Sequence, residues 1–238
     1  SAVRCQPLSR ALYFYEGFPN MQNNLKFSSI CSFLIKELDL YKTHVTKVEL
    51  LLASEVETFN KELLVITEQM SDSDANGFKC YREDDFFDLS ITFPLIQRKS
   101  ELISAYTILE NGLNKVCEIF EENIDNPIKL SDLSAYGIID KSKKYLEKVA
   151  QINFPCGDGT AWVEIQLIQE IRNVFVHNEG VVKSGNKQLI SYIGQSPFLE
   201  LKPDFKVFIK RGFSYYCLQL FQEFFFSLFS EIDRSKKI

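Results

Sequence analysis

The sequence contains only two histidines, His44 and His177, and its six cysteines are scattered without a CxxC pair. The histidines are far apart, and no HxxxH, HxH or clustered carboxylate spacing accompanies them, which argues against a metal site. The glycine-rich loops that hold nucleotide phosphates or dinucleotides are missing as well. We therefore expect no metal and no cofactor, and we expect the thiols to be reduced.

We expect no secretory leader, and the sequence contains no long uninterrupted apolar run. The most apolar stretch, residues 213–232, contains two glutamines and two glutamates, which a bilayer would accept only at a high free-energy cost. This pattern predicts a core helix rather than a membrane anchor. The sequence accordingly predicts a cytoplasmic protein with no membrane partner.

The charge balance is acidic, with 27 basic against 32 acidic side chains and a net charge of −5. Non-specific nucleic-acid binding depends on a basic surface that neutralises phosphates, so this composition counts against indiscriminate binding. Any contact with RNA must therefore be local. Basic side chains cluster within residues 141–148, 183–187 and 206–211.

The spacing of apolar residues predicts a mainly α fold. Over residues 30–66 they recur at intervals of three and four, which indicates one long amphipathic helix. The polar segment 71–77 predicts a turn, and a second long helix through residues 102–120 then forms an antiparallel partner. A later helix over residues 161–177 is expected to end at Gly180 and to bury Trp162, Ile165, Ile168 and Ile171.

The composition changes after Gly180. Residues 189–193, 198–201 and 206–209 have the pattern of short strands, and an aromatic-rich helix follows them. The predicted fold is a bundle of long antiparallel helices with a small β-hairpin element before the C-terminal helix. We expect an N-terminal extension (1–24), the helical bundle (25–182), and a β-element with the last helix (183–238) packed on the bundle as one compact unit.

The segment 170–180 carries the most informative chemistry. Asn173 and His177 lie four residues apart and share one side of the predicted helix, whereas Arg172 points about 140° away from His177. One helix cannot bring Arg172 and His177 together, so we expect a two-fold homodimer with the site at its interface. His177 lies in the last turn, where the helix dipole favours a positive charge. An arginine that can grip phosphate and a histidine that can move protons are the parts of a metal-free ribonuclease.

These residues resemble the Arg-x(4–6)-His signature of the HEPN-domain superfamily (higher eukaryotes and prokaryotes nucleotide-binding). The resemblance covers residues 93–180, including the paired long helices, and extends to Asn178 and Gly180. It implies a metal-independent endoribonuclease of the toxin and antiviral-defence kind, acting on an RNA substrate and controlled by a cognate antitoxin or a defence-system partner. The expected product ends are a 2′,3′-cyclic phosphate and a 5′-hydroxyl.

The resemblance also implies residue roles. His177 would move protons, Arg172 would stabilise charge on the phosphate, and Asn173 would hold the imidazole or the scissile phosphate. Glu110, on the preceding long helix, and Asn178 are candidate supporting residues. The alternative is a non-catalytic module that binds proteins or nucleotides, which the acidic composition also fits. His44 has no comparable neighbours and is expected to be structural or exposed to solvent.

Overall fold

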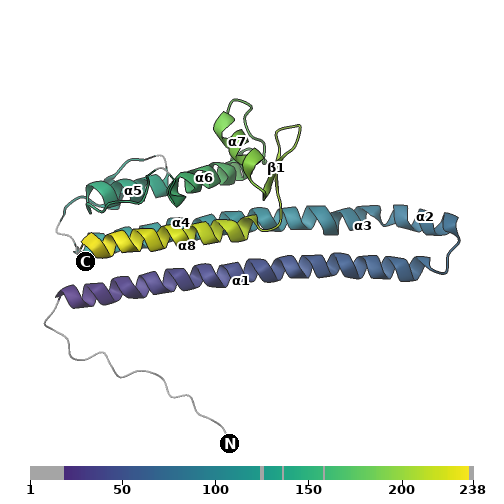
Figure 1. Ribbon diagram of the computed structural model, residues 1–238, viewed down its shortest axis with the longest axis horizontal. Helices are drawn as coiled ribbons and strands as arrows, with labels where there is room; N and C mark the ends of the chain where they lie inside the picture. Colours follow the sequence, from purple (N-terminus) through teal and green to yellow (C-terminus); the bar gives the residue numbers. More distant parts are fainter. Residues whose placement is uncertain (1–18, 124–125, 136, 158, 236–238) are drawn as a thin grey trace, which may run out of the picture.

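The computed structural model describes residues 19–123, 126–135, 137–157 and 159–235, with side chains from Phe27 onward. The protein is mainly helical, as expected. Helix α1 (Pro19–Thr67) runs antiparallel to a helical path that returns beside it over almost its whole length (Figure 1). The return path consists of α2 (Asp72–Tyr81), α3 (Glu83–Phe87), a π-helical turn (Asp88–Thr92) and α4 (Phe93–Asn123).

Helix α1 forms because its apolar residues repeat at helical spacing and no proline or glycine follows Pro19 within it. Its inner seam, which includes Leu34, Leu38, Val45 and Phe59, is buried. The first 18 residues of the expected N-terminal extension lie outside the described residues. Residues 19–24, which we had assigned to that extension, belong to α1.

The prediction of a turn over residues 71–77 was wrong, because this segment begins α2. Ser71 is the N-cap of α2, and its hydroxyl oxygen accepts a hydrogen bond from the backbone N–H of Asp74 at 3.2 Å. Asp72 and Asp74 lie in the first turn, where the helix dipole favours negative charge. Serine and aspartate thus start a helix here.

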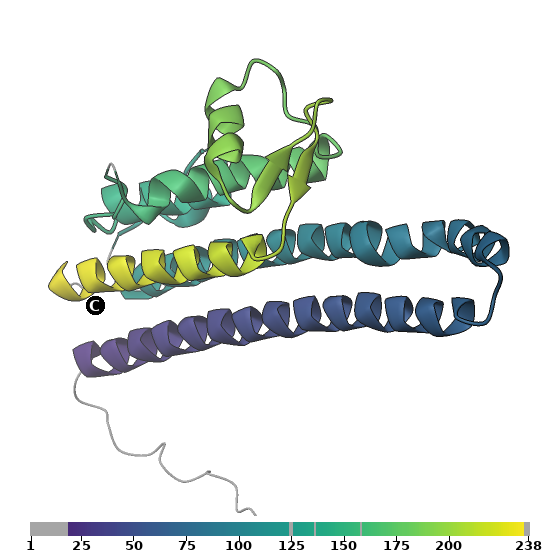
Figure 2. The ribbon, with the colours of Figure 1, turned by 45° about the vertical axis from the view of Figure 1, so that its right-hand side comes forward.

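The remaining elements build a layer above the long hairpin. Helices α4 and α8 lie side by side, α1 packs below them, and α5 and α6 pack above them (Figure 2). After a 3₁₀ turn (Leu130–Asp132), the chain forms α5 (Ile138–Lys148), α6 (Ala161–His177), α7 (Lys187–Gln195), β1 (Leu199–Leu201), β2 (Val207–Ile209) and α8 (Phe213–Ser235). Among the described helices, none has the length and apolar content needed to cross a membrane.

The hairpin before α8 is confirmed, but the strand predicted at residues 189–193 was wrong. Strands β1 and β2 pair antiparallel, with Leu199 opposite Ile209. Residues 189–193 belong to α7, whose N-cap Asn186 accepts a hydrogen bond from the backbone N–H of Leu189. Leu189 and Ile193, one helical turn apart, are both buried, so packing favours the helix over the β-propensity of isoleucine.

A buried ion pair joins α1, α4 and the hairpin. Arg98 donates from Nε and Nη2 to the two carboxylate oxygens of Glu49, at 2.6 and 2.9 Å, and from Nη1 to the carbonyl oxygen of Ile209 at 3.3 Å. A bidentate pair has a fixed geometry, so this contact sets the position of α4 relative to α1. It therefore also fixes where the hairpin attaches.

Candidate functional site

The segment with the Arg-Asn-x-x-x-His pattern forms α6 with the predicted bounds. Trp162, Ile165, Ile168 and Ile171 are all buried, as expected from their spacing. On another side of α6, Gln166, Glu170, Asn173 and His177 follow one another at intervals of three and four and are exposed or half-buried. The helix therefore presents a polar stripe that contains two of the three predicted site residues.

The end of α6 is tightly defined. The backbone N–H groups of Asn178 and Gly180 both donate to the carbonyl oxygen of Val174, at 3.0 Å each. Gly180 has a φ of +87°, a conformation that glycine adopts without strain. Asn178 is the C-cap residue, so His177 and Asn178 lie in the last turn of α6, where a positive charge is favoured.

Arg172 faces the interior, toward α4. Its guanidinium carbon lies 5.5 Å from the centre of the Tyr106 ring, and its Nη1 donates to Oδ1 of the neighbouring Asn173 at 3.0 Å. The Arg172 Nε and the Tyr106 hydroxyl are buried and make no hydrogen bond to any described residue. Arg172 is thus held between a buried aromatic ring and a residue of the polar stripe.

Glu110 lies one helical turn beyond Tyr106 on α4 and interacts with the charge of Arg172. Burial raises the pKa of the Glu110 carboxyl, and the Arg172 charge opposes that rise. Burial also raises the pKa of Tyr106, and the negative charge of Glu110 adds to this rise. Glu110 thus lies within electrostatic reach of Arg172, and the structure adds Tyr106, which sequence reasoning missed. The available signal was its spacing, four residues before Glu110.

A polar groove of about 430 Å³ opens beside Asn173 and Asn178. It lies between α6 and the segment leading into α7, and Asn186 Nδ2 donates to a carboxylate oxygen of Glu170 across it at 2.7 Å. Its lining is rich in amide side chains and includes the exposed Lys183, and such groups can donate to phosphate and base atoms. The full lining is Gln166, Gln169, Glu170, Asn173, Val174, Asn178, Val182, Lys183, Asn186 and Leu189.

The three motif residues divide between two sides of α6. His177 is exposed at the end of the stripe, whereas Arg172 is half-buried against α4, so one subunit does not bring the two together. Asn173 links the two sides, because its side-chain oxygen accepts a hydrogen bond from Arg172 and it lies on the same face of α6 as His177. Its amide nitrogen donates to no described residue and stays available to a ligand.

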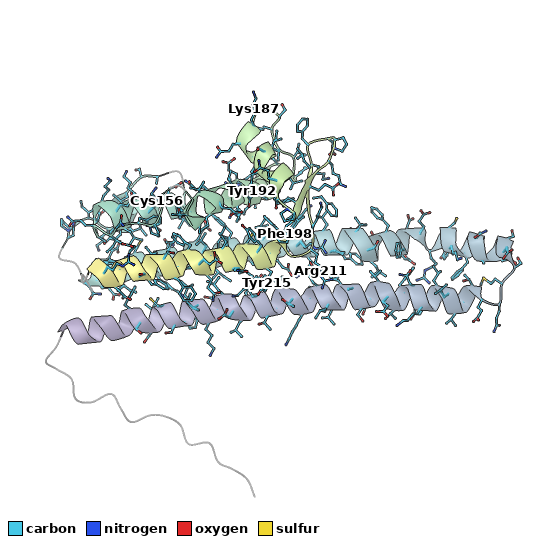
Figure 3. All side chains as sticks on the ribbon, in the orientation of Figure 1. Cys156, Lys187, Tyr192, Phe198, Arg211 and Tyr215 are labelled. Carbon is cyan, nitrogen blue, oxygen red and sulfur yellow. The ribbon has the colours of Figure 1, made fainter. Side chains whose placement is uncertain are left out.

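A second hollow, of about 270 Å³, lies between α1 and the beginning of α8 and shares no residue with the groove. Phe198, Arg211 and Tyr215 line it (Figure 3). Lys187 lies at the outer end of α7, away from this hollow (Figure 3). The other histidine, His44, is exposed on α1 and lines a different groove.

Within the described part of the chain, no three histidine, cysteine, aspartate or glutamate side chains are grouped so that they could hold a metal ion. Comparisons with models of protein families, with curated proteins and with solved structures gave no match. The chemistry of the α6 site therefore has to be argued from its own residues.

Proposed function

We propose that this protein is a metal-independent endoribonuclease that acts in the cytoplasm as a toxin or in antiviral defence. The observation that carries the proposal is the Arg172–Asn173 hydrogen bond at the edge of the polar groove, with His177 exposed on the same face as Asn173. This arrangement offers a hydrogen-bond donor to a phosphate oxygen, a half-buried positive charge behind it and a proton-transfer group. The substrate is RNA, because the reaction needs a 2′-hydroxyl as nucleophile.

The reaction requires a base and an acid. The base takes the proton of the 2′-hydroxyl as its oxygen attacks phosphorus, the bond from phosphorus to the 5′-oxygen breaks, and the acid returns a proton to that oxygen. The products are a 2′,3′-cyclic phosphate and a 5′-hydroxyl. A two-fold dimer that brings two copies of His177 into one cleft supplies both groups.

Asn173 and Arg172 act on the phosphate together. The Asn173 amide nitrogen donates to a phosphate oxygen, while Arg172 fixes the amide through its oxygen and contributes positive charge from behind. A charge held in a partly buried position acts over several ångströms, because little water screens it. Glu110 and Tyr106 position the guanidinium, and Asn178 and Lys183 extend the groove for neighbouring nucleotides.

A second candidate function is a non-catalytic module that binds proteins or nucleotides, or a cognate antitoxin or defence partner. The observation in its favour is that Arg172 is engaged within the subunit, over Tyr106 and with Asn173. An arginine with such partners can serve structure alone. Activity measurements separate the two functions.

The test is RNA cleavage by purified variants. His177→Ala is expected to lower the rate by about 10²–10⁴-fold, because it removes the proton-transfer group. Arg172→Ala is expected to lose about 10²–10³-fold, comparable to one oxyanion donor, and Asn173→Ala less. Arg172→Lys should stay impaired, because lysine keeps the charge but lacks the planar fork that holds Asn173.

Matched controls are Arg234→Ala and Asn60→Ala, which remove exposed side chains of the same types elsewhere in the chain. Both should cleave at the wild-type rate, and all variants should keep the helical circular-dichroism spectrum. A fully active His177→Ala variant, or a wild type that cleaves none of a panel of RNAs, would favour the interaction module.

A further inference from the structure

The outer face of α1 carries a second helical seam beside its buried one. Three of its apolar side chains are more than half exposed: Phe33 at 59%, Leu40 at 62% and Leu51 at 65%. The seam is Phe33, Glu37, Leu40, His44, Lys47 and Leu51, and we call these six residues the outer stripe. Their intervals alternate between four and three, which is the spacing of helices that pack along each other.

A groove runs alongside the outer stripe. It has a volume of about 740 Å³ and lies between α1 and α4, with Ser104 and Ile108 as its α4 wall. Phe33, Leu40 and His44 of the stripe form part of its α1 wall. A helix seated on the stripe therefore meets a concave surface that can take side chains from the incoming helix.

The order of residues in the stripe is self-complementary. If a second α1 lies antiparallel with the two-fold axis at residue 42, Phe33 faces Leu51 of the partner subunit and Leu40 faces His44 of the partner subunit. Glu37 then faces Lys47 of the partner subunit, and the pair occurs twice by symmetry. Neither Glu37 nor Lys47 has an ion-pair partner among the described residues, so both charges are available for this contact.

We propose that a second copy of this chain docks on the outer stripe, forming an antiparallel two-fold contact between the α1 helices. A surface that complements itself under a two-fold rotation is the requirement for such a contact, and a different partner would have no need of it. Residues 33–51 span about 27 Å of helix at about 1.5 Å per residue, enough for five turns of packing. The contact is separate from the α6 site, because α1 and α6 lie on opposite sides of the layer formed by α4 and α8 (Figure 1).

The test exploits the paired charges. Glu37→Lys places lysine opposite lysine twice, and Lys47→Glu places glutamate opposite glutamate twice. Each variant alone should form the contact at least about tenfold more weakly than the wild type, since facing like charges cost several kcal/mol. Light scattering should then report a lower mass than that of the wild type, half of it where α1 supplies the contact alone. An equimolar mixture of the two variants should regain the wild-type mass, because each lysine then faces a glutamate.

If α1 supplies the contact alone, each variant falls from dimer to monomer; if the proposed α6 contact also forms, each falls from a larger assembly to the α6 dimer, and the mixture regains the wild-type mass in both cases. Lys61→Glu is the matched control, because Lys61 lies on α1 outside the stripe and should leave the mass unchanged. Lys47 and Lys61 are exposed and Glu37 is half-buried in the wall of a groove, so the helical circular-dichroism spectrum should stay the same. The proposal is overturned if either single variant keeps the wild-type mass, or if the mixture stays at the mass of the single variants.

Discussion

At the scale of single residues, Glu101 is the clearest departure from the rule that charged groups stay in water. It is 1% exposed on α4. Burial raises the pKa of this carboxyl, and hydrogen bonding with Gln97, at 3.2 Å, and with Ser214 only partly opposes the rise. As the pH rises, the folded protein therefore keeps the Glu101 proton to a higher pH than the unfolded chain does.

The raised pKa of Glu101 makes the stability of the fold depend on pH. A group with a raised pKa stabilises the fold below its unfolded pKa of about 4.3, and this contribution is lost as the pH rises through the folded pKa. Glu101→Gln mimics the protonated form and should raise the free energy of unfolding at neutral pH. The gain over wild type should shrink as the pH falls toward 4.3. Denaturant melts of both proteins across this range would show a constant difference if the idea is wrong.

The residue types of the candidate site could be found from the sequence, but their environment could not. Arg172, Asn173 and His177 form a recognisable pattern, and Glu110 was selected because it lies on the preceding long helix. The contact of Arg172 with Tyr106 depends on how α6 packs on α4, more than 60 residues away in sequence. Spacing along one helix cannot predict such a contact, and the groove beside Asn173 depends equally on the segment before α7.

At the scale of secondary-structure elements, α1, α4 and α8 approach each other at Gly112. A Cβ atom placed there would lie 2.8 Å from Cζ of Phe225 and 2.9 Å from Cδ2 of Leu34. Both neighbours are buried, so they have little room to move. Glycine is therefore required at this position by the close packing of three helices.

Two glycine substitutions test this packing. Gly112→Ala should lower the free energy of unfolding by roughly 1 kcal/mol, because overpacking costs about 1–3 kcal/mol and outweighs the helix-propensity gain of about 1 kcal/mol. Gly77→Ala, in exposed helix α2 with no atom near its Cβ position, should instead raise it by up to about 1 kcal/mol. Thermal or urea unfolding measures both. Equal shifts for the two variants would contradict this account of Gly112.

The bounds of an element could be predicted where its residues favour a single secondary structure. They could not be predicted where the same residues suit two different structures. Helix α6 has the predicted bounds because its apolar period is helical and Gly180 ends it. Helix α7 was predicted as a strand because Leu189, Ile190 and Ile193 suit either structure, and only burial of Leu189 and Ile193 together decides for the helix. At Ser71 the same residue types that make turns also cap helices.

At the scale of the whole molecule, two surfaces lie on opposite sides of the layer formed by α4 and α8. Helix α6, which carries His177 and lines the polar groove, lies above the layer of α4 and α8, whereas α1, which carries the outer stripe, lies below that layer (Figures 1 and 2). One side is polar and is where we propose that RNA binds, and the other is partly apolar and is where we propose that a second copy of the chain docks. The general plan, long antiparallel helices with a small hairpin, follows from periodicity, but the layering depends on contacts such as Arg98 with Glu49.

The most direct test of the proposed function is the chemistry of the RNA ends that the purified protein forms in EDTA. The protein should cleave RNA under these conditions and leave a 2′,3′-cyclic phosphate and a 5′-hydroxyl, because the 2′-oxygen attacks the phosphate and His177 moves the protons. The His177→Ala variant should form almost none of these ends. Ends with a 5′-phosphate, cleavage that EDTA abolishes, or equal cleavage by the wild type and His177→Ala would contradict the account.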